Sequence, residues 1–129
     1  MNKFLKYWLP PIVWMCIIFY MSSQQHVSVS TQSTYNFVVL KTGHMIGYAI
    51  LYLLFFRAVY SQKKKQKLDE VLLRAIFYTL LYAAFDEIHQ LFVPTRTGHL
   101  QDVAIDSIGV FIVYTFIKYN FKHIKHFIT

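Results

Sequence analysis

The sequence predicts an all-α protein, a bundle of four helices that cross a membrane. The chain has 129 residues, enough for one domain, of which 56% are hydrophobic and 19% aromatic, which is too apolar for an ordinary soluble domain of this size. Its apolar residues gather in four long blocks, and its lysines gather beside and between those blocks. Each block approaches the ~20 residues that a helix needs to cross ~30 Å of hydrocarbon.

The four apolar blocks are expected to be the membrane spans of a single domain, residues 1–129. They run approximately over residues 4–21, 37–60, 71–93 and 103–119. Pro94 follows the third block and stops a helix, so we expect the third helix to reach Val93. The single cysteine, Cys16, lies inside the first block and provides no disulfide framework and no cysteine-based metal site.

The first block also has features of a signal peptide. Lys3 and Lys6 precede its apolar core, and Ser28 and Ser30 form a weak small-x-small cleavage site. Pro10 and Pro11 fit the start of a helix better than the middle of a cleavable core. Three remaining spans would also place the C-terminus on the wrong side for its charges, so we interpret the first block as a membrane span.

The placement of the lysines predicts the topology. They precede the first block, fill the connection between the second and third blocks, and follow the fourth: Lys3, Lys6, Lys63, Lys64, Lys65, Lys67, Lys118, Lys122 and Lys125. These regions lie on one side of a four-span protein, and the positive-inside rule makes that side the cytoplasm. The formal net charge of +7 therefore indicates cytoplasmic termini and contact with anionic lipid, and we expect no nucleic-acid partner.

With this orientation, the polar residues of the spans gather in the outer half of the bilayer. They are Ser22, Ser23 and Gln24; Lys41 and His44; Asp86, Glu87, His89 and Gln90; and Asp102 and Asp106. Helical spacing places them on stripes that continue through Tyr48, Tyr82 and Gly109 or Val110. The sequence therefore predicts a polar pocket where the stripes face one another. Gly43, Gly47 and Gly109 are expected to be positions of close helix packing.

The charges of this region do not balance. Lys41 and Arg96 are its lysine and arginine residues, and its carboxylates are Asp86, Glu87, Asp102 and Asp106. A charged group near the centre of a membrane helix costs about 2.5–3.5 kcal/mol, and less near the ends. The two surplus negative charges require protonated carboxylates, charged histidines, a bound cation or a cationic part of a ligand. Each option gives the residues a chemical use, so we interpret them as functional.

Four segments together carry a resemblance to a known family. They are Ser-Ser-Gln at residues 22–24, KTGHMIGYAIL from Lys41, DEIHQLFVPTRTG from Asp86 and DVAIDSIG from Asp102. In this order, over essentially the whole chain, they resemble the VanZ-like membrane proteins. The sequence departs from that pattern at Thr95, where Gly is common, near His99, where Ser is frequent, and at Asp106, where Asn is frequent. The last departure leaves open whether Asp106 carries charge.

The resemblance implies a multi-pass protein of the bacterial cytoplasmic membrane, of the type linked to low-level resistance to teicoplanin-like glycopeptides. It also implies a relation to four-helix membrane enzymes, including phosphatidylserine synthases, that act on phosphate-linked lipid head groups. The positions that match the family's site residues are Lys41, His44, Glu87, His89, Gln90, Arg96, Asp102 and Asp106.

Our first hypothesis is an enzyme, a phosphotransferase or hydrolase of lipid head groups, whose substrate is a membrane lipid or a polyprenyl-linked molecule at the outer leaflet. The expected substrate-binding residues are Lys41, Arg96, Gln90, Gln24 and Ser23, with the two cations on phosphate oxygens. His89 or His44 would be the general acid/base or the nucleophile, assisted by Glu87 or Asp106.

A divalent cation is a possible cofactor of this site. Its candidate ligands are Asp102, Asp106 and Glu87. Oxygen ligands favour Mg, Mn or Ca, whereas the addition of two histidines would favour Zn.

Two other function classes stay open. The first is a binding module that captures a lipid-linked wall precursor or a lipoglycopeptide without turnover. The presence of two histidines among carboxylates favours an enzyme over a binding module, because binding phosphate alone needs cations rather than acids. The second is an ion or proton path. The ionisable residues stop at mid-membrane, and four spans are few for alternating access, so a path is disfavoured.

Overall fold

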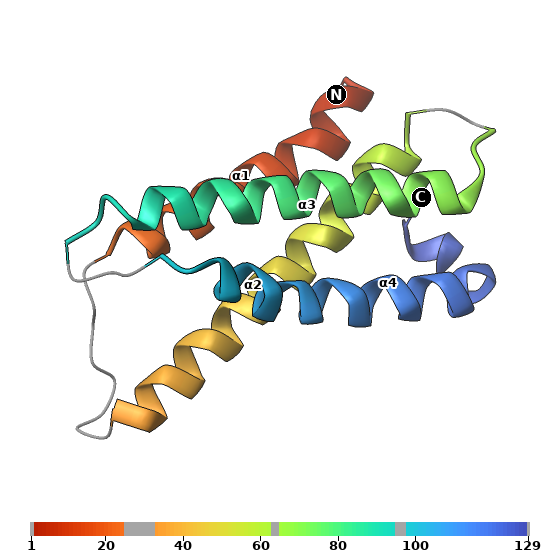
Figure 1. The fold of residues 1–129 in the computed structure, drawn as a ribbon. Coiled ribbons are helices and arrows are strands. Elements are labelled where there is room, and N and C mark those ends of the chain that lie inside the picture. The colour runs from red at the N-terminus through yellow and green to blue at the C-terminus, as the bar shows by residue number, and fades with distance from the viewer. Residues whose placement is uncertain (1, 25–32, 63–64, 95–97, 129) are drawn as a thin grey trace.

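A computed structural model describes residues 2–24, 33–62, 65–94 and 98–128. Within these ranges the chain forms four helices and no strand: α1 (Lys3–Ser23), α2 (Ser33–Tyr60), α3 (Leu68–Gln90) and α4 (Leu100–Ile128) (Figure 1). The predicted all-α four-helix bundle is confirmed. Arg96 and Thr95 lie outside the described residues.

The helices run alternately up and down the bundle. At one end, the Nε atom of Arg57 near the end of α2 donates to the carbonyl oxygen of Ile128 at the end of α4 (3.1 Å). The Arg57 guanidinium also lies 5.3 Å from the ring centroid of Tyr7 at the start of α1. At the other end, Ser22 of α1 donates to Asp86 of α3. The two ends of the bundle therefore hold different sets of helix termini.

The core follows the centre of the bundle around α2, which contacts each of the other three helices. Its largest fully buried apolar side chains are Tyr48, Tyr52, Phe56 and Leu51 from α2, with Leu72 from α3 and Ile117 from α4. Burial of such side chains contributes roughly 1.5–3 kcal/mol each when they leave water. In a membrane, close packing rather than removal from water holds helices together.

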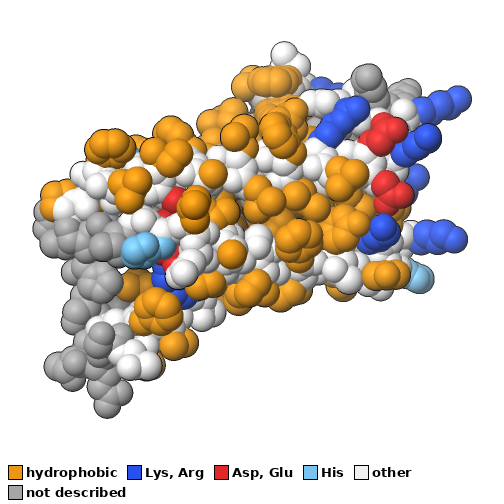
Figure 2. Space-filling view, viewed as in Figure 1, with side chains coloured by type: hydrophobic (Ala, Val, Ile, Leu, Met, Phe, Trp, Pro, Cys, Tyr) orange, Lys and Arg blue, Asp and Glu red, His pale blue; other side chains and the backbone are white. Residues whose placement is uncertain are grey.

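Three helices are apolar and long enough to cross a membrane by length and composition: Lys3–Ser23, Thr34–Tyr60 and Leu100–Ile128. The fourth, α3, has 23 residues and carries Arg74, Asp86 and Glu87. Asp86 and Glu87 are buried inside the bundle. The outward face of α3 exposes Leu73, Phe77, Leu81, Phe85 and Ile88. Figure 2 shows this apolar surface continuing over most of the visible face, as expected of a membrane protein.

The positive charges gather at one end of the bundle. Figure 2 shows most of the visible lysine and arginine side chains at the right-hand end. This is the end where the exposed Lys118 of α4 pairs with Asp69 at the start of α3 (3.5 Å). The end of α2, the start of α3 and the end of α4 therefore lie at the same end of the molecule, as the predicted topology requires.

The helices differ from the predicted spans at several ends; α2, for example, begins at Ser33 rather than near residue 37. Helix α3 ends at Gln90, not Val93, because the amides of Leu91, Phe92 and Val93 donate to carbonyl groups three residues earlier. This tighter winding fits the residue before Pro94, for which helical backbone is disfavoured. Helix α4 continues beyond residue 119 to Ile128, so the basic segment after the fourth apolar block is helical too.

Gly109 allows α2 and α4 to approach closely. A Cβ atom added at Gly109 would overlap the carbonyl oxygen of Met45 on α2 and lie 2.9 Å from its Cγ atom. At Gly43 and Gly47 an added Cβ atom would have no atom within 4 Å. The prediction of close packing is confirmed at Gly109 and wrong at Gly43 and Gly47, because those two face open space.

We expect Gly109→Ala to destabilise the bundle by roughly 1–3 kcal/mol, because the backbone of Met45 must move away. Gly43→Ala is the matched control. It adds the same methyl group to open space and gains up to about 1 kcal/mol of helix propensity. Thermal unfolding of both variants in detergent, followed by circular dichroism, measures the difference. Equal melting temperatures would contradict the close approach.

The arrangement of the helices also predicts the topology in cells. Reporter domains fused after Lys65 and after Thr129 should both read as cytoplasmic, because both positions follow lysines in the sequence that the positive-inside rule assigns to that side. A reporter that reads as external at either position would contradict this orientation.

Candidate functional site

Asp86 organises the end of the bundle opposite the lysines. Its side chain is fully buried, and one oxygen, Oδ2, accepts three hydrogen bonds. The donors are Ser22 Oγ of α1 (2.8 Å), the Tyr48 hydroxyl of α2 (2.9 Å) and Gln90 Nε2 of α3 (3.2 Å). The second oxygen, Oδ1, is buried without a hydrogen-bond partner among the described residues. Asp86 thus joins α1, α2 and α3 through one of its two carboxylate oxygens.

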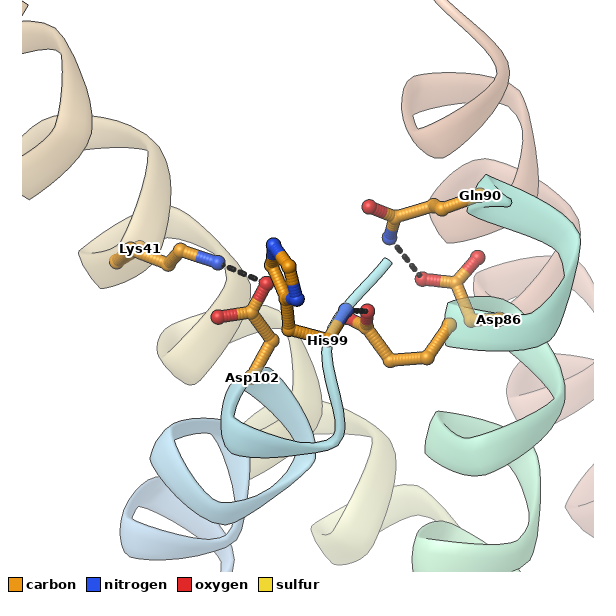
Figure 3. Close-up of polar contacts among 6 residues, drawn as sticks. Lys41, Asp86, Gln90, His99 and Asp102 are labelled. Atoms are coloured by element: carbon orange, nitrogen blue, oxygen red, sulfur yellow. Dashed lines mark hydrogen bonds and ion pairs between the residues drawn. The ribbon is translucent and has the colours of Figure 1, made fainter. Parts of the chain in front are cut away.

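Lys41 and Asp102 form an ion pair between α2 and α4. Their side chains are 24% and 13% exposed, so the pair lies at the border of the buried region. Figure 3 shows the Lys41 side chain reaching toward the Asp102 carboxylate at the start of α4, on the opposite side of the view from Asp86 and Gln90. This pair neutralises one carboxylate of the four.

Glu87 connects α3 to the start of α4. Its Oε2 atom accepts a hydrogen bond from the backbone amide of His99 (3.1 Å), and its side chain is buried. Gly98 lies directly against this turn of α3, since an added Cβ atom would overlap the carbonyl oxygen of Glu87 and lie 3.1 Å from Leu91 Cδ2. The side chain of Glu87 therefore fixes the backbone that leads into α4.

Asp106, one turn after Asp102, is 2% exposed. Its Oδ1 atom is buried without a hydrogen-bond partner among the described residues. Asp106 is close enough to Glu87, Asp102 and Asp86 to interact with them electrostatically, and Lys41 is in the same range. We call these four carboxylates, Asp86, Glu87, Asp102 and Asp106, the acidic cluster.

Three histidines lie on, or directly before, the helices that carry the acidic cluster and its donors. The ring of His89 packs on Phe19 of α1 with centroids 4.2 Å apart, and its Nδ1 atom is buried without a partner among the described residues. The ring of His44 is half-buried and lies 6.4 Å from that of Tyr48. His99 is exposed, and Figure 3 shows its ring standing in the space between the Lys41–Asp102 pair and the Asp86–Gln90 pair.

The remaining predicted site residues differ in whether they contact the acidic cluster. Gln90 belongs to the cluster through Asp86. Ser23 and Gln24 instead donate to the carbonyl oxygens of Phe19 and Tyr20 in their own helix, at 2.7 and 3.3 Å. Arg96 lies outside the described residues.

Three residues that join this site have no role assigned to them from the sequence alone: Ser22, Tyr48 and Asp86. Asp86 was counted as a charge and Tyr48 as part of a stripe, without a role for either. The spacing signal was present for Ser22, which directly precedes Ser23 at the end of an apolar helix. His99 lies three residues before Asp102, which places it at the start of the same helix face.

The predicted metal ligands do not converge on one ion. In the part of the chain that the structure describes, no group of three or more His, Cys, Asp or Glu side chains is placed to hold a metal. We therefore derive no step through Mg, Mn, Ca or Zn at Asp102, Asp106 and Glu87.

The fold and the acidic cluster define a class, the multi-pass helical membrane proteins that bury ionisable groups at one end of the bundle. The sequence matches the family model described as VanZ/LLP1 over residues 7–123, a range that contains every residue of the acidic cluster. The chain belongs to the VanZ/LLP1 family. No curated protein and no solved structure gives a significant match to it.

The hydrogen bonds of Asp86 predict an asymmetry between two buried tyrosines of α2. Tyr48→Phe removes a donor to Asp86 and should destabilise the protein by about 1–3 kcal/mol. Tyr52→Phe is the matched control, since the Tyr52 hydroxyl is buried without a hydrogen-bond partner among the described residues and its removal should be neutral or stabilising. Chemical unfolding of both variants in detergent measures the difference. Equal losses at the two positions would refute the bond from Tyr48 to Asp86.

Proposed function

We propose that this protein acts on phosphate-linked lipid head groups or lipid-linked cell-envelope precursors at the outer leaflet of the bacterial cytoplasmic membrane. The observation that carries the proposal is the acidic cluster, together with its lysine, amide and histidine neighbours, at the end of an apolar bundle opposite the lysine-rich end. A phosphate-linked lipid keeps its tails in hydrocarbon and its phosphate at the interface. That depth matches the end of the bundle where the polar groups gather.

Within the part of the chain that the structure describes, Lys41 is the proposed phosphate-binding residue. Its ammonium lies at the border of the buried region, where it can meet a head group and still hold Asp102. Arg96, four residues before Leu100 in the sequence, would add the planar fork of a guanidinium to the same phosphate.

A histidine would carry the proton transfer. In hydrolysis, water attacks phosphorus, the bond from phosphorus to the leaving oxygen breaks, and that oxygen takes up a proton. The candidates are His89, next to Gln90 in α3, His44, whose ring lies near that of Tyr48, and His99, directly before α4. A neighbouring carboxylate can orient such a ring and stabilise its charged form. A transferase would follow the same course with a hydroxyl group in place of water.

A role in resistance to teicoplanin-like glycopeptides would follow from the same chemistry. An enzyme that alters lipid-linked envelope components at the outer leaflet changes the surface that a glycopeptide with a lipid tail meets. This part of the proposal rests on membership of the family and on the side of the membrane that the lysines predict.

The test is mass spectrometry of lipids incubated with the purified protein in liposomes, using a panel of phospholipids and polyprenyl phosphates. We expect a head-group change that falls about 100-fold or more in His89→Ala, the scale of a lost general acid or base, and that is also lost in Arg96→Ala. Arg74→Ala, an exposed arginine of α3, is the matched control and should retain activity.

Normal turnover in both site variants would contradict the assigned site. If no lipid is altered but one co-purifies with the wild type and is lost from Arg96→Ala, the protein binds head groups without turnover.

A further inference from the structure

The acidic cluster carries more negative charge than its surroundings neutralise. Among the described residues, Lys41 is the lysine or arginine that pairs with it, and that pair uses Asp102. Asp86, Glu87 and Asp106 remain, each at most 6% exposed. Even with Arg96 added, the carboxylates outnumber the cations by two. Phosphate alone would increase this excess, so a purely anionic head group fits the site poorly.

Two oxygens within the cluster are buried and have no donor. Asp86 Oδ1 and Asp106 Oδ1 lack partners among the described residues, although Asp86 is fully buried and Asp106 is 2% exposed. Buried polar atoms of native proteins are nearly always hydrogen-bonded, so each unpartnered atom needs an explanation. A carboxylate oxygen can only accept, and the missing group must therefore be a donor.

The two oxygens belong to one region. Tyr48 of α2 donates to Asp86. Asp106 lies on α4 between Asp102, which pairs with Lys41, and Gly109, which packs against Met45, so it faces the stretch of α2 that leads to Tyr48. A single small ligand with a positive charge and several N–H donors would therefore neutralise part of the excess negative charge and donate hydrogen bonds to both unpartnered oxygens.

We propose that Asp86 and Asp106 form a binding site for a primary ammonium group on the head group of the lipid substrate. The proposal rests on the function proposed above and specifies its substrate class, a phosphate-linked head group that also bears an amine. A primary ammonium has three N–H donors, whereas a quaternary ammonium has the same charge and none. Lys41 would meet the phosphate while the ammonium lies deeper, between the two aspartates.

The Lys41–Asp102 pair shows that this cluster accepts a primary ammonium. It also marks the approach, because its side chains are partly exposed whereas Asp86 and Asp106 are not. A head group that enters past this pair would place its phosphate beside Lys41 first.

The test compares lipids with different head groups: phosphatidylethanolamine and phosphatidylcholine differ only at the nitrogen, and phosphatidylglycerol has a phosphate without any amine. Short-chain forms of the three lipids are titrated onto the full-length protein in detergent, and dissociation constants are measured by native mass spectrometry. We expect phosphatidylethanolamine to bind at least about tenfold more tightly than the other two, the effect of charge-assisted hydrogen bonds. Asp106→Asn should reduce that ratio to near one.

Asp69→Asn is the matched control, since it removes the same charge at an exposed position beside Lys118 and should keep the preference. If Asp106→Asn fails to fold, the comparison of the three lipids on the wild type decides. Equal affinity for phosphatidylethanolamine and phosphatidylcholine would overturn the ammonium site, while turnover of any phosphate-linked lipid would leave the proposed function intact. Preference without turnover would support the ammonium site and contradict the enzyme.

Discussion

A buried carboxylate in a membrane bundle must be given donors, and the hydrogen bonds to Asp86 are the interaction on which the rest of this structure depends. Ser22, Tyr48 and Gln90 all donate to the same oxygen of Asp86. They bring together the end of α1, the middle of α2 and the end of α3. Because an isolated charge in hydrocarbon is costly, none of these helices can rotate or slide freely without exposing the carboxylate to an apolar surrounding.

The two ends of the bundle consequently serve different purposes. At the lysine-rich end, Arg57 joins α2 to the last turn of α4 and stacks on Tyr7 of α1, so these contacts hold helix ends together. At the other end, the acidic cluster joins α3 and α4 through Glu87 and the backbone of His99, and Asp86 Oδ1 and Asp106 Oδ1 lack donors among the described residues. Buried carboxylate oxygens without donors are features of the kind that functional sites carry.

Much of the fold and the approximate location of the site were predictable from the sequence. Long apolar blocks can form only helices in a membrane, and helical spacing brought Asp102, Asp106 and Gly109 to one buried face. Spacing could not show which atoms pair. Ser23 and Gln24 bond to their own helix while their neighbour Ser22 meets Asp86, because one residue of helix rotation decides the partner. Gly43 failed as a packing position for the same reason, since spacing does not say which side a neighbour occupies.

The central claim is that the acidic cluster is a head-group site that opens toward lipid, rather than a set of charges that only holds helices together. A crystal structure grown in a lipid mesophase that contains phosphatidylethanolamine tests it most directly. The account predicts head-group density with its phosphate beside Lys41 and its nitrogen within hydrogen-bond distance of Asp86 Oδ1 or Asp106 Oδ1. Lipid head groups confined to the rim, with both aspartate oxygens bonded to protein alone, would contradict it.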